Sequence, residues 1–436
     1  MKRTSRKIET EFAVVGTGIA GFAASLFAHA RGLDVTQVGH SGAIAYTTGY
    51  LDLLGAREGA LLDDPWAGLD ALRTLAPGHP FARLANDDIR TALSEFIAAL
   101  NTGGIGYTPV GARNVKALLP YGVTKPTLSV PETMQPGIEA KEAGAPTLIV
   151  DIEGLQGFSA QEFQTNLAAE WPGLRTAKLA FPGLDGRQVF PEVMARSLET
   201  RATREAFAEL LRPLLGEATH VGLPAILGMR APDAVRADLE ERIGATLFEI
   251  PTMPPAVPGI RLREMFEQAL PAHGIRLEPQ LKVAKVDLGT DGARLTLHGP
   301  MEDIEIDAAS VLLATGRFLS GGLASDRQHV WETLLDLPVR QPASRDDWYR
   351  ATYFDPRGHA INRFGVDVDE GFRPLGANGQ PASPRLFSAG AIISGQDWVR
   401  ERSGAGLAIA TAYGAVRAAA EVLRQPAPRY SAGALG

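Results

Sequence analysis

The sequence predicts an α/β fold, in which a Rossmann-like domain with a parallel sheet is interrupted by an inserted α/β substrate or cap domain. A Gly-x-Gly-x-x-Gly turn at 16–21 lies between a short apolar strand pattern and an apolar helix pattern. Buried-strand patterns that run into glycine return far along the chain, at 310–317 and 385–391. We therefore expect the segment between these regions to split the nucleotide-binding fold.

Each glycine of the turn has a separate expected role. Residues 12–15 form the strand and 22–31 the helix of a dinucleotide-binding unit. Gly16 permits the tight turn, Gly18 lets the backbone approach a phosphate, and Gly21 lets the helix pack closely on the strand. Free amides at the start of the helix would hold the phosphate.

The second strand of this unit, at 34–38, lacks an expected feature. Gly32 can end the preceding helix. Such a strand usually ends in Asp or Glu, which bonds to the adenosine ribose. Here Gly39, His40 and Ser41 follow instead. Either His40 or Ser41 takes that role, or no adenosine ribose is bound there.

The start of the chain also fits a secretory signal in part. Basic residues gather at 2–7, and 13–30 carries no formal charge. The three ordered glycines, the strand directly after Gly32, and the acids Glu9 and Glu11 argue against export.

Composition limits the class of protein. The 436 residues suffice for two or three domains, and the net charge of −7 implies no broad nucleic-acid-binding surface. The chain contains no cysteine, which excludes disulfides, thiolate catalysis and cysteine-ligated iron–sulfur clusters within it. No metal site is predicted. Beyond the first helix, no uninterrupted apolar segment is long enough to span a bilayer.

The remaining elements suggest three parts. Strands are expected at 147–151, 246–250, 281–288 and 293–297, and helices at 84–100, 159–171, 191–215, 259–272 and 407–423. Residues 1–54 and 276–436 would form the nucleotide-binding domain, and 55–275 the insertion. The start of the insertion, at 55–100, looks largely helical. Four prolines make 251–258 a rigid, extended segment.

Four glycine-bearing turns, at 16–21, 47–49, 315–316 and 404–406, define a candidate cofactor site. Three of them follow an apparent buried strand or start a helix, so the pattern resembles a two-domain flavoprotein. In that superfamily the last strand motif usually ends in Gly-Asp, but here Ala391 follows Gly390. Beyond the first turn, the candidate cofactor-binding residues are His40, Ser41, Thr47, Thr48, Gly49, Thr315, Gly316, Gly390, Ala391, Ser403, Gly404 and Gly406.

A closer resemblance covers about residues 12–420. The segments at 41–54, 119–126, 250–262 and 316–323 resemble B subunits of anaerobic glycerol-3-phosphate dehydrogenases. The proline-rich run into Gly-Ile-Arg-Leu and the run Phe-Leu-Ser-Gly-Gly-Leu are the distinctive parts.

This resemblance implies oxidation of glycerol 3-phosphate to dihydroxyacetone phosphate, with electrons passing to quinone. It implies a second flavoprotein subunit and an iron–sulfur subunit that anchors the complex, so the chain would be cytoplasmic and attached peripherally to the inner membrane. The lack of cysteine agrees with clusters held by another subunit.

The expected cofactor is FMN, with FAD as the alternative. The two absent acids would each remove a charge-assisted hydrogen bond worth about 1.5–3 kcal/mol. FMN has no adenosine ribose and would lose only one of them, and the resemblance favours the same choice. The glycine turn itself is suited to a pyrophosphate, which favours FAD.

Substrate oxidation requires a base for the hydroxyl proton and cations for the phosphate. His359, Arg363 and Arg373 precede the last flavin strand, and Lys125 lies in one of the family-like segments. These four are the candidate catalytic and substrate-binding residues. Two other functions stay open: a stand-alone flavin dehydrogenase of another small hydroxy or amino acid, and a non-catalytic assembly subunit with a degenerate flavin fold.

Overall fold

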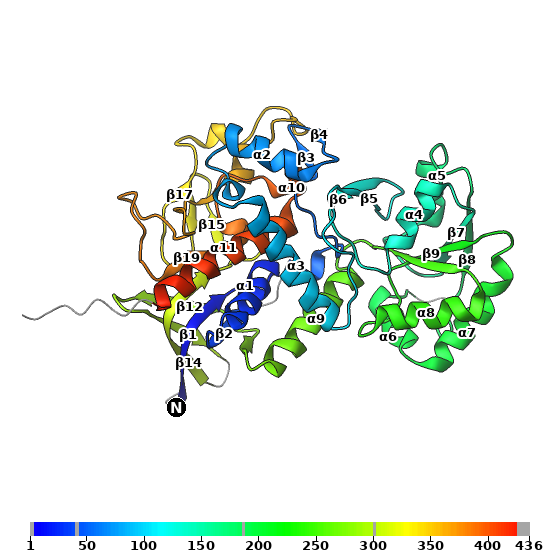
Figure 1. Cartoon of the computed structure of the whole chain (residues 1–436), viewed down its shortest axis with the longest axis horizontal. Helices are drawn as coiled ribbons and strands as arrows, with labels where there is room; N and C mark the ends of the chain where they lie inside the picture. The colour runs from blue at the N-terminus through cyan, green and yellow to red at the C-terminus, as the bar shows by residue number, and fades with distance from the viewer. Residues whose placement is uncertain (1–3, 40–42, 185–187, 300–301, 425–436) are drawn as a thin grey trace, which may run out of the picture.

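The computed structural model describes residues 4–39, 43–184, 188–299 and 302–424. The chain forms two lobes that lie side by side (Figure 1). The larger lobe contains both ends of the described chain and a seven-stranded sheet, and the smaller lobe contains a four-stranded sheet.

The large sheet has the strand order β11-β2-β1-β14-β13-β12, and β19 also pairs with β14. Its strands are β1 (Thr4–Val15), β2 (Val35–Gly39), β11 (Arg276–Pro279), β12 (Val283–Leu288), β13 (Ala293–His298), β14 (Glu302–Leu313) and β19 (Leu386–Ser388). The pairings β11-β2, β2-β1, β1-β14 and β14-β19 are parallel, whereas β12, β13 and β14 pair antiparallel. The predicted parallel nucleotide-binding sheet is confirmed.

Strand β1 is much longer than the apolar pattern at 12–15 predicted. It pairs with β14 along its whole length, and its basic residues lie beside acids of β14 and β11. Arg6 lies 2.7 Å from Glu278 and 3.4 Å from Glu302, and Lys7 lies 3.9 Å from Glu305. Arg6 and Lys7 are thus part of the sheet, and α1 (Ile19–Ala30), the helix that follows β1, is largely buried.

Helices α1, α9 (Val257–Ala272) and α11 (Gly404–Arg424) pack against this sheet, and α3 (Asn86–Thr102) packs on α1 and α11. Helix α2 (Pro65–Leu75) and the short α10 (Trp398–Glu401) lie farther from the sheet in the same lobe (Figure 1). Helix α11 is long and apolar enough to cross a membrane, contrary to the expectation from the sequence. However, 72% of its apolar window is buried inside the fold, as in a core helix.

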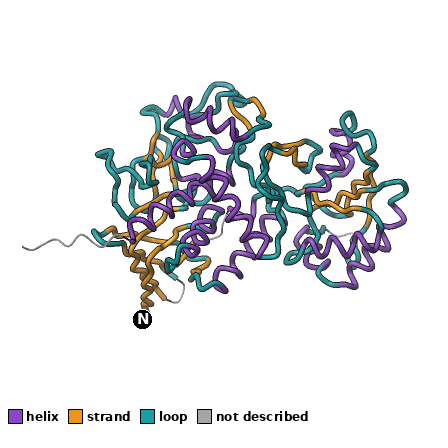
Figure 2. The backbone as a smooth tube through the Cα atoms, in the orientation of Figure 1, coloured by secondary structure: helices purple, strands orange, loops and turns teal. Residues whose placement is uncertain are grey.

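The smaller lobe is a parallel sheet of order β10-β9-β7-β8 with helices on both sides (Figure 2). Its strands are β7 (Thr147–Ile152), β8 (Leu174–Leu179), β9 (His220–Pro224) and β10 (Thr246–Ile250), and its helices are α4 (Gln135–Ala143), α5 (Ala160–Leu167), α6 (Pro191–Leu198), α7 (Arg201–Leu211) and α8 (Pro232–Ile243). Two-stranded pieces complete the chain: β3 (Ala56–Arg57) with β4 (Ala60–Leu61), β5 (Val115–Leu118) with β6 (Thr124–Thr127), β15 (Leu323–Ser325) with β16 (Val330–Glu332), and β17 (Val339–Arg340) with β18 (Gly365–Val366).

The segment expected as one insertion, 55–275, is divided between two cores. Buried residues within 66–107 and 262–275 pack with the core of the large lobe, whereas most of those within 118–250 form a separate core. The physical reason is that the apolar face of α3 packs against α11, and periodicity alone does not say which surface an amphipathic helix will cover. The chain directly after Gly55 is a hairpin rather than a helix.

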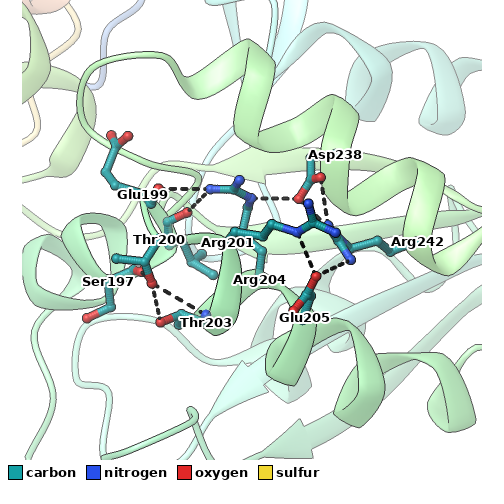
Figure 3. Close-up of polar contacts among 10 residues, drawn as sticks. Ser197, Glu199, Thr200, Arg201, Thr203, Arg204, Glu205, Asp238 and Arg242 are labelled. Carbon is teal, nitrogen blue, oxygen red and sulfur yellow. Dashed lines mark hydrogen bonds and ion pairs between the residues drawn. The ribbon is translucent and has the colours of Figure 1, made fainter.

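Helices α7 and α8 are joined by an ion-pair network on the surface of the smaller lobe (Figure 3). Arg204 and Arg242 both contact Asp238, at 2.6 and 2.9 Å, and Arg242 also reaches Glu205. Hydrogen bonds from both arginines lower the pKa of Asp238 to about 2. Arg204 also donates to the carbonyls of Leu198 and Glu199 at the end of α6, which ties three helices together.

A fully buried ion pair joins the two lobes. Arg261 of α9 donates both terminal nitrogens to Glu249 of β10, at 2.6 and 2.7 Å, and its Nε to the Gly228 carbonyl. The Thr133 hydroxyl and the Leu227 amide donate to the same carboxylate. Burial alone would raise the pKa of Glu249, but these four donors together hold it below its ordinary value.

We expect Arg261→Leu to lower the free energy of unfolding by about 3–5 kcal/mol, because it leaves the Glu249 carboxylate buried without its counter-charge. The control is Arg201→Ala, which breaks a pair whose arginine side chain is 77% exposed and should cost about 0.5 kcal/mol or less. Urea unfolding monitored by circular dichroism measures both. Equal effects of the two substitutions would show that the buried pair does not hold the lobes together.

Candidate functional site

The glycine turn connects β1 to α1 and combines two close contacts with one open space. A Cβ at Gly16, whose φ is +133°, would lie 2.2 Å from the Ala314 carbonyl oxygen, and one at Gly21 would lie 2.0 Å from the Gly16 oxygen. A Cβ at Gly18 would meet no atom within 4 Å. Gly16 and Gly21 therefore allow the packing of β14 and α1, while Gly18 borders a space that a ligand could fill.

Gln37 of β2 fixes this turn, and sequence reasoning missed it. Its side chain is fully buried, and Nε2 donates to the Gly16 carbonyl at 2.8 Å. The Ser25 hydroxyl of α1 donates to the Gln37 side-chain oxygen, Oε1, at 2.8 Å. One amide thus bridges the strand, the turn and the helix. The available signal was a polar residue in an otherwise apolar strand pattern.

The end of β2 offers no carboxylate. A Cβ at Gly39 would lie 2.7 Å from the Thr17 side chain, so glycine lets β2 close against the turn. His40 and Ser41, expected as substitutes for the acid, lie outside the described residues.

Two hydroxyl groups beside the turn are free to bind a ligand. In the described part of the chain, Thr17 Oγ1 and Thr315 Oγ1 are both buried without a hydrogen-bond partner. Thr315 follows β14, whose end meets Gly16. Buried hydroxyls without partners are costly in a protein. A phosphate or ribityl group in the open space at Gly18 would supply acceptors and donors for them, so the residues present fit a flavin nucleotide.

Gly390 lies on the other side of the same turn. Its φ is +75°, a Cβ there would lie 2.8 Å from the Ala20 side chain, and its amide donates to Thr411 of α11. The Ala391 carbonyl accepts a 2.8 Å hydrogen bond from Arg317. Burial lowers the pKa of that guanidinium to about 10. Ala391 thus supports the fold through its backbone, and its methyl side chain cannot hydrogen-bond to a ribityl hydroxyl.

The first turn of α11 brings a second group of candidates together. The Gly406 amide donates to the Asp52 carbonyl at 2.7 Å, and a Cβ at Gly406 would lie 2.7 Å from the Leu53 Cα. Ser403 is fully buried and Gly404 lies against Trp398. These contacts place the start of α11 directly on the segment that follows the 47–49 turn.

That turn is fixed by residues from two other parts of the chain. Gly49, with φ of +86°, has its carbonyl bonded by the Tyr107 hydroxyl at 2.7 Å, and Pro258 of α9 lies against it. Thr47 Oγ1 accepts the Gly49 amide at 3.2 Å, and Thr48 Oγ1 accepts the Tyr50 amide at 3.5 Å, so both hydroxyls help to form the turn.

Asp52, Lys125 and Arg402 form a charged cluster between the lobes. Lys125 of β6 lies 2.5 Å from Asp52 Oδ2, and the buried Oδ1 of Asp52 lies near the Thr127 hydroxyl at the end of the same strand. Burial raises the pKa of Asp52, although Lys125 and Arg402 partly offset this effect. Arg402 has a buried Nη1 without a partner in the same described part of the chain, and its φ of +51° is unusual for a non-glycine residue.

Sequence reasoning found Lys125 but missed Asp52 and Arg402, because nothing local connects residues so far apart in the chain. The remaining candidates do not join this cluster. His359 Nδ1 accepts the Arg350 amide and its Nε2 donates to the Tyr353 carbonyl, so both ring nitrogens are occupied within one loop. Arg373 pairs with Asp369 at 2.6 Å.

Arg363 is exposed, and its guanidinium makes a 3.5 Å hydrogen bond to the Arg357 carbonyl of its own loop. The three residues expected to bind substrate near the last flavin strand thus serve loop structure or face solvent.

The glycine turn at the end of β1, the free hydroxyls and the start of α11 define a nucleotide-binding flavoprotein of the two-lobed kind. Residues 11–407 match the FAD binding domain family. The chain belongs to this family and, within it, to that of the B subunits of anaerobic glycerol-3-phosphate dehydrogenase, as two relatives demonstrate.

The B subunit of a probable anaerobic glycerol-3-phosphate dehydrogenase from Halobacterium salinarum is 31% identical over 95% of this chain and 99% of its own length. The B subunit of an anaerobic glycerol-3-phosphate dehydrogenase from Vibrio cholerae is 30% identical over 93% of this chain and 95% of its own length. Among solved structures, the open conformation of a flavocytochrome c3 fumarate reductase covers 96% of this chain and 79% of its own at 12% identity and a TM-score of 0.43.

The preference for FMN over FAD is not supported, because the matching family is described as an FAD binding domain. The preference rested on two absent acids. It gave too little weight to the turn, where the open space at Gly18 and the free Thr17 hydroxyl are suited to a pyrophosphate.

Two alanine substitutions separate binding from packing in this turn. We expect Gly18→Ala to fold normally, because its φ of −89° and ψ of −178° suit alanine, but to lose about tenfold or more of its flavin affinity, because the methyl group enters the open space. Gly21→Ala should instead destabilise the protein, because its Cβ would overlap the Gly16 carbonyl. Flavin titration and thermal unfolding measure the two effects. Undiminished flavin binding by Gly18→Ala would show that the space is not the phosphate site.

Proposed function

We propose that this chain uses FAD to oxidise sn-glycerol 3-phosphate to dihydroxyacetone phosphate. Family membership supports the flavin and the substrate class. The observation that carries the proposal is the interlobe cluster, in which the buried Asp52 carboxylate lies beside two cations, Lys125 and Arg402. A phosphorylated alcohol requires this combination of a base and an anion site.

The FAD would be held at both ends of the site. The amides after Gly16 and the hydroxyls of Thr17 and Thr315 would bind the phosphates and ribityl chain, and the amides of Gly404 and Ala405 would bind the pyrimidine edge at the positive end of α11. When bound, the flavin supplies the acceptor for the hydride that leaves the carbinol carbon.

The protein residues divide the remaining work. Asp52 Oδ1 takes the hydroxyl proton, and its second oxygen is kept in place by Lys125. Lys125 and Arg402 bind the phosphate dianion, Arg402 through the Nη1 that otherwise lacks a partner. His359, Arg363 and Arg373 are left out of this assignment because their contacts lie within their own loops or they face solvent.

We further propose that electrons leave through partner proteins. A second flavoprotein and an iron–sulfur subunit would carry them to quinone, and the iron–sulfur subunit would attach the complex to the cytoplasmic face of the membrane. Two observations support this: the relatives are named as one subunit of a dehydrogenase, and this chain has no cysteine to ligate a cluster.

The base assignment predicts a pH effect. Asp52 must be ionised to accept a proton, so kcat/KM should fall as the pH falls through its pKa, which burial places above the ordinary value for aspartate. Asp52→Asn should lose about 10²–10⁴-fold in kcat and should lack this acid limb. Asp63→Asn, which removes an exposed carboxylate paired with Arg113, is the control and should keep full activity. An unchanged pH profile in Asp52→Asn would rule out this base.

Purification of the tagged chain from its own cells tests the complex. We expect a second flavoprotein and a cysteine-rich iron–sulfur protein to copurify with it, and denaturation to release FAD in equimolar amount. Quinone reduction by the isolated chain would favour a stand-alone dehydrogenase. A colourless chain that cannot be reconstituted with flavin would favour a non-catalytic assembly role.

A further inference from the structure

A buried chain of hydrogen bonds lies directly behind Arg402. It starts at His79, which is 3% exposed and lies in the loop between α2 and α3. His79 Nδ1 accepts the Phe81 amide at 3.1 Å, so the ring proton is on Nε2. That nitrogen lies 3.2 Å from Glu401 Oε2 and donates to it.

Glu401 connects the two sides of the turn between α10 and α11. Its Oε1 accepts the Asp397 amide at 3.0 Å, before the turn, and its Oε2 accepts the Ser403 hydroxyl at 3.3 Å, after it. The Gly55 amide donates to the backbone oxygens of Glu401 and Arg402, at 2.9 and 3.2 Å. The side chain of Glu401 therefore fixes the turn from inside and Gly55 fixes it from outside.

The turn needs such restraint because Arg402 occupies the left-handed region, at φ +51° and ψ 56°. A residue with a side chain stays in this conformation only when its surroundings determine it. A guanidinium presented from this backbone reaches the Asp52 side of the site, where it offsets part of the rise that burial causes in the pKa of that carboxyl. Neither His79 nor Glu401 has been given a role in the proposed reaction.

We propose that His79 is a positioning residue which, through Glu401, holds the left-handed turn that directs Arg402 towards the substrate phosphate. The inference rests on the proposed function insofar as Arg402 binds that phosphate. His79 itself touches neither substrate nor flavin. Its contribution is the single hydrogen bond from Nε2, because its other ring nitrogen only orders the loop at Phe81.

Two substitutions of similar shape isolate this bond. His79→Gln can place an amide donor near the position of Nε2 and keep the bond to Glu401. His79→Asn places an acceptor near the position of Nδ1 for the Phe81 amide but is too short to reach Glu401. Both remove the imidazole, so a role limited to core packing would affect them equally.

We expect His79→Asn to raise KM for glycerol 3-phosphate by about tenfold, because it loses a hydrogen bond to a charged group. The change in kcat should be smaller. Amide hydrogen exchange in the peptide 397–407 should be faster in His79→Asn than in wild type, measured without substrate. His79→Gln should restore both quantities to within about threefold of wild type.

Equal behaviour of the two variants in KM and in hydrogen exchange would overturn the proposal and leave His79 as a packing residue. A change in unfolding temperature alone, with KM and exchange at 397–407 unaffected, would overturn it as well. If the wild-type protein does not bind glycerol 3-phosphate, the proposed function fails. The exchange rates of the two variants then still decide whether His79 holds the turn.

Discussion

The buried pair between Glu249 and Arg261 determines how the two lobes meet, and the charged cluster depends on that arrangement. Asp52 and Arg402 belong to the larger lobe, whereas Lys125 belongs to the hairpin beside the smaller lobe. The Glu249 carboxylate accepts four hydrogen bonds, and the Arg261 guanidinium donates to three acceptors. The lobes can therefore shift little relative to each other, because a shift would leave a buried charge unpaired. The pair is therefore a constraint on geometry more than a source of stability.

Helix α11 imposes the second constraint, because its first two turns touch both ends of the candidate flavin site. Gly406 meets the backbone at Asp52, and Thr411, five residues later, receives the amide of Gly390 beside the phosphate turn. Five residues of α-helix span about 7.5 Å, so the helix sets a fixed distance between the two groups. Only glycine at 406 allows this approach.

Local sequence signals predicted the nucleotide-binding unit well, because strand, glycine turn and helix follow one another within a short stretch of chain. The strands β10, β12 and β13 were likewise predicted from short sequence patterns. The sequence did not predict that α2 and α3 belong to the large lobe, because the pattern of an amphipathic helix does not show which surface its apolar face will cover. The interlobe cluster was missed for a similar reason: Asp52 and Arg402 approach only after the chain has folded.

Charge explains why such a cluster suits the proposed reaction. Two cations and one carboxylate give the site an excess of positive charge, which attracts a phosphate dianion. Once the dianion is bound, the site carries an excess of negative charge as long as Asp52 is ionised. Transfer of the hydroxyl proton to Asp52 removes this excess and leaves Lys125 and Arg402 to balance the phosphate. Burial favours the same outcome, because it disfavours the ionised form of Asp52. The features that make Asp52 costly to bury are thus those that make it an effective proton acceptor.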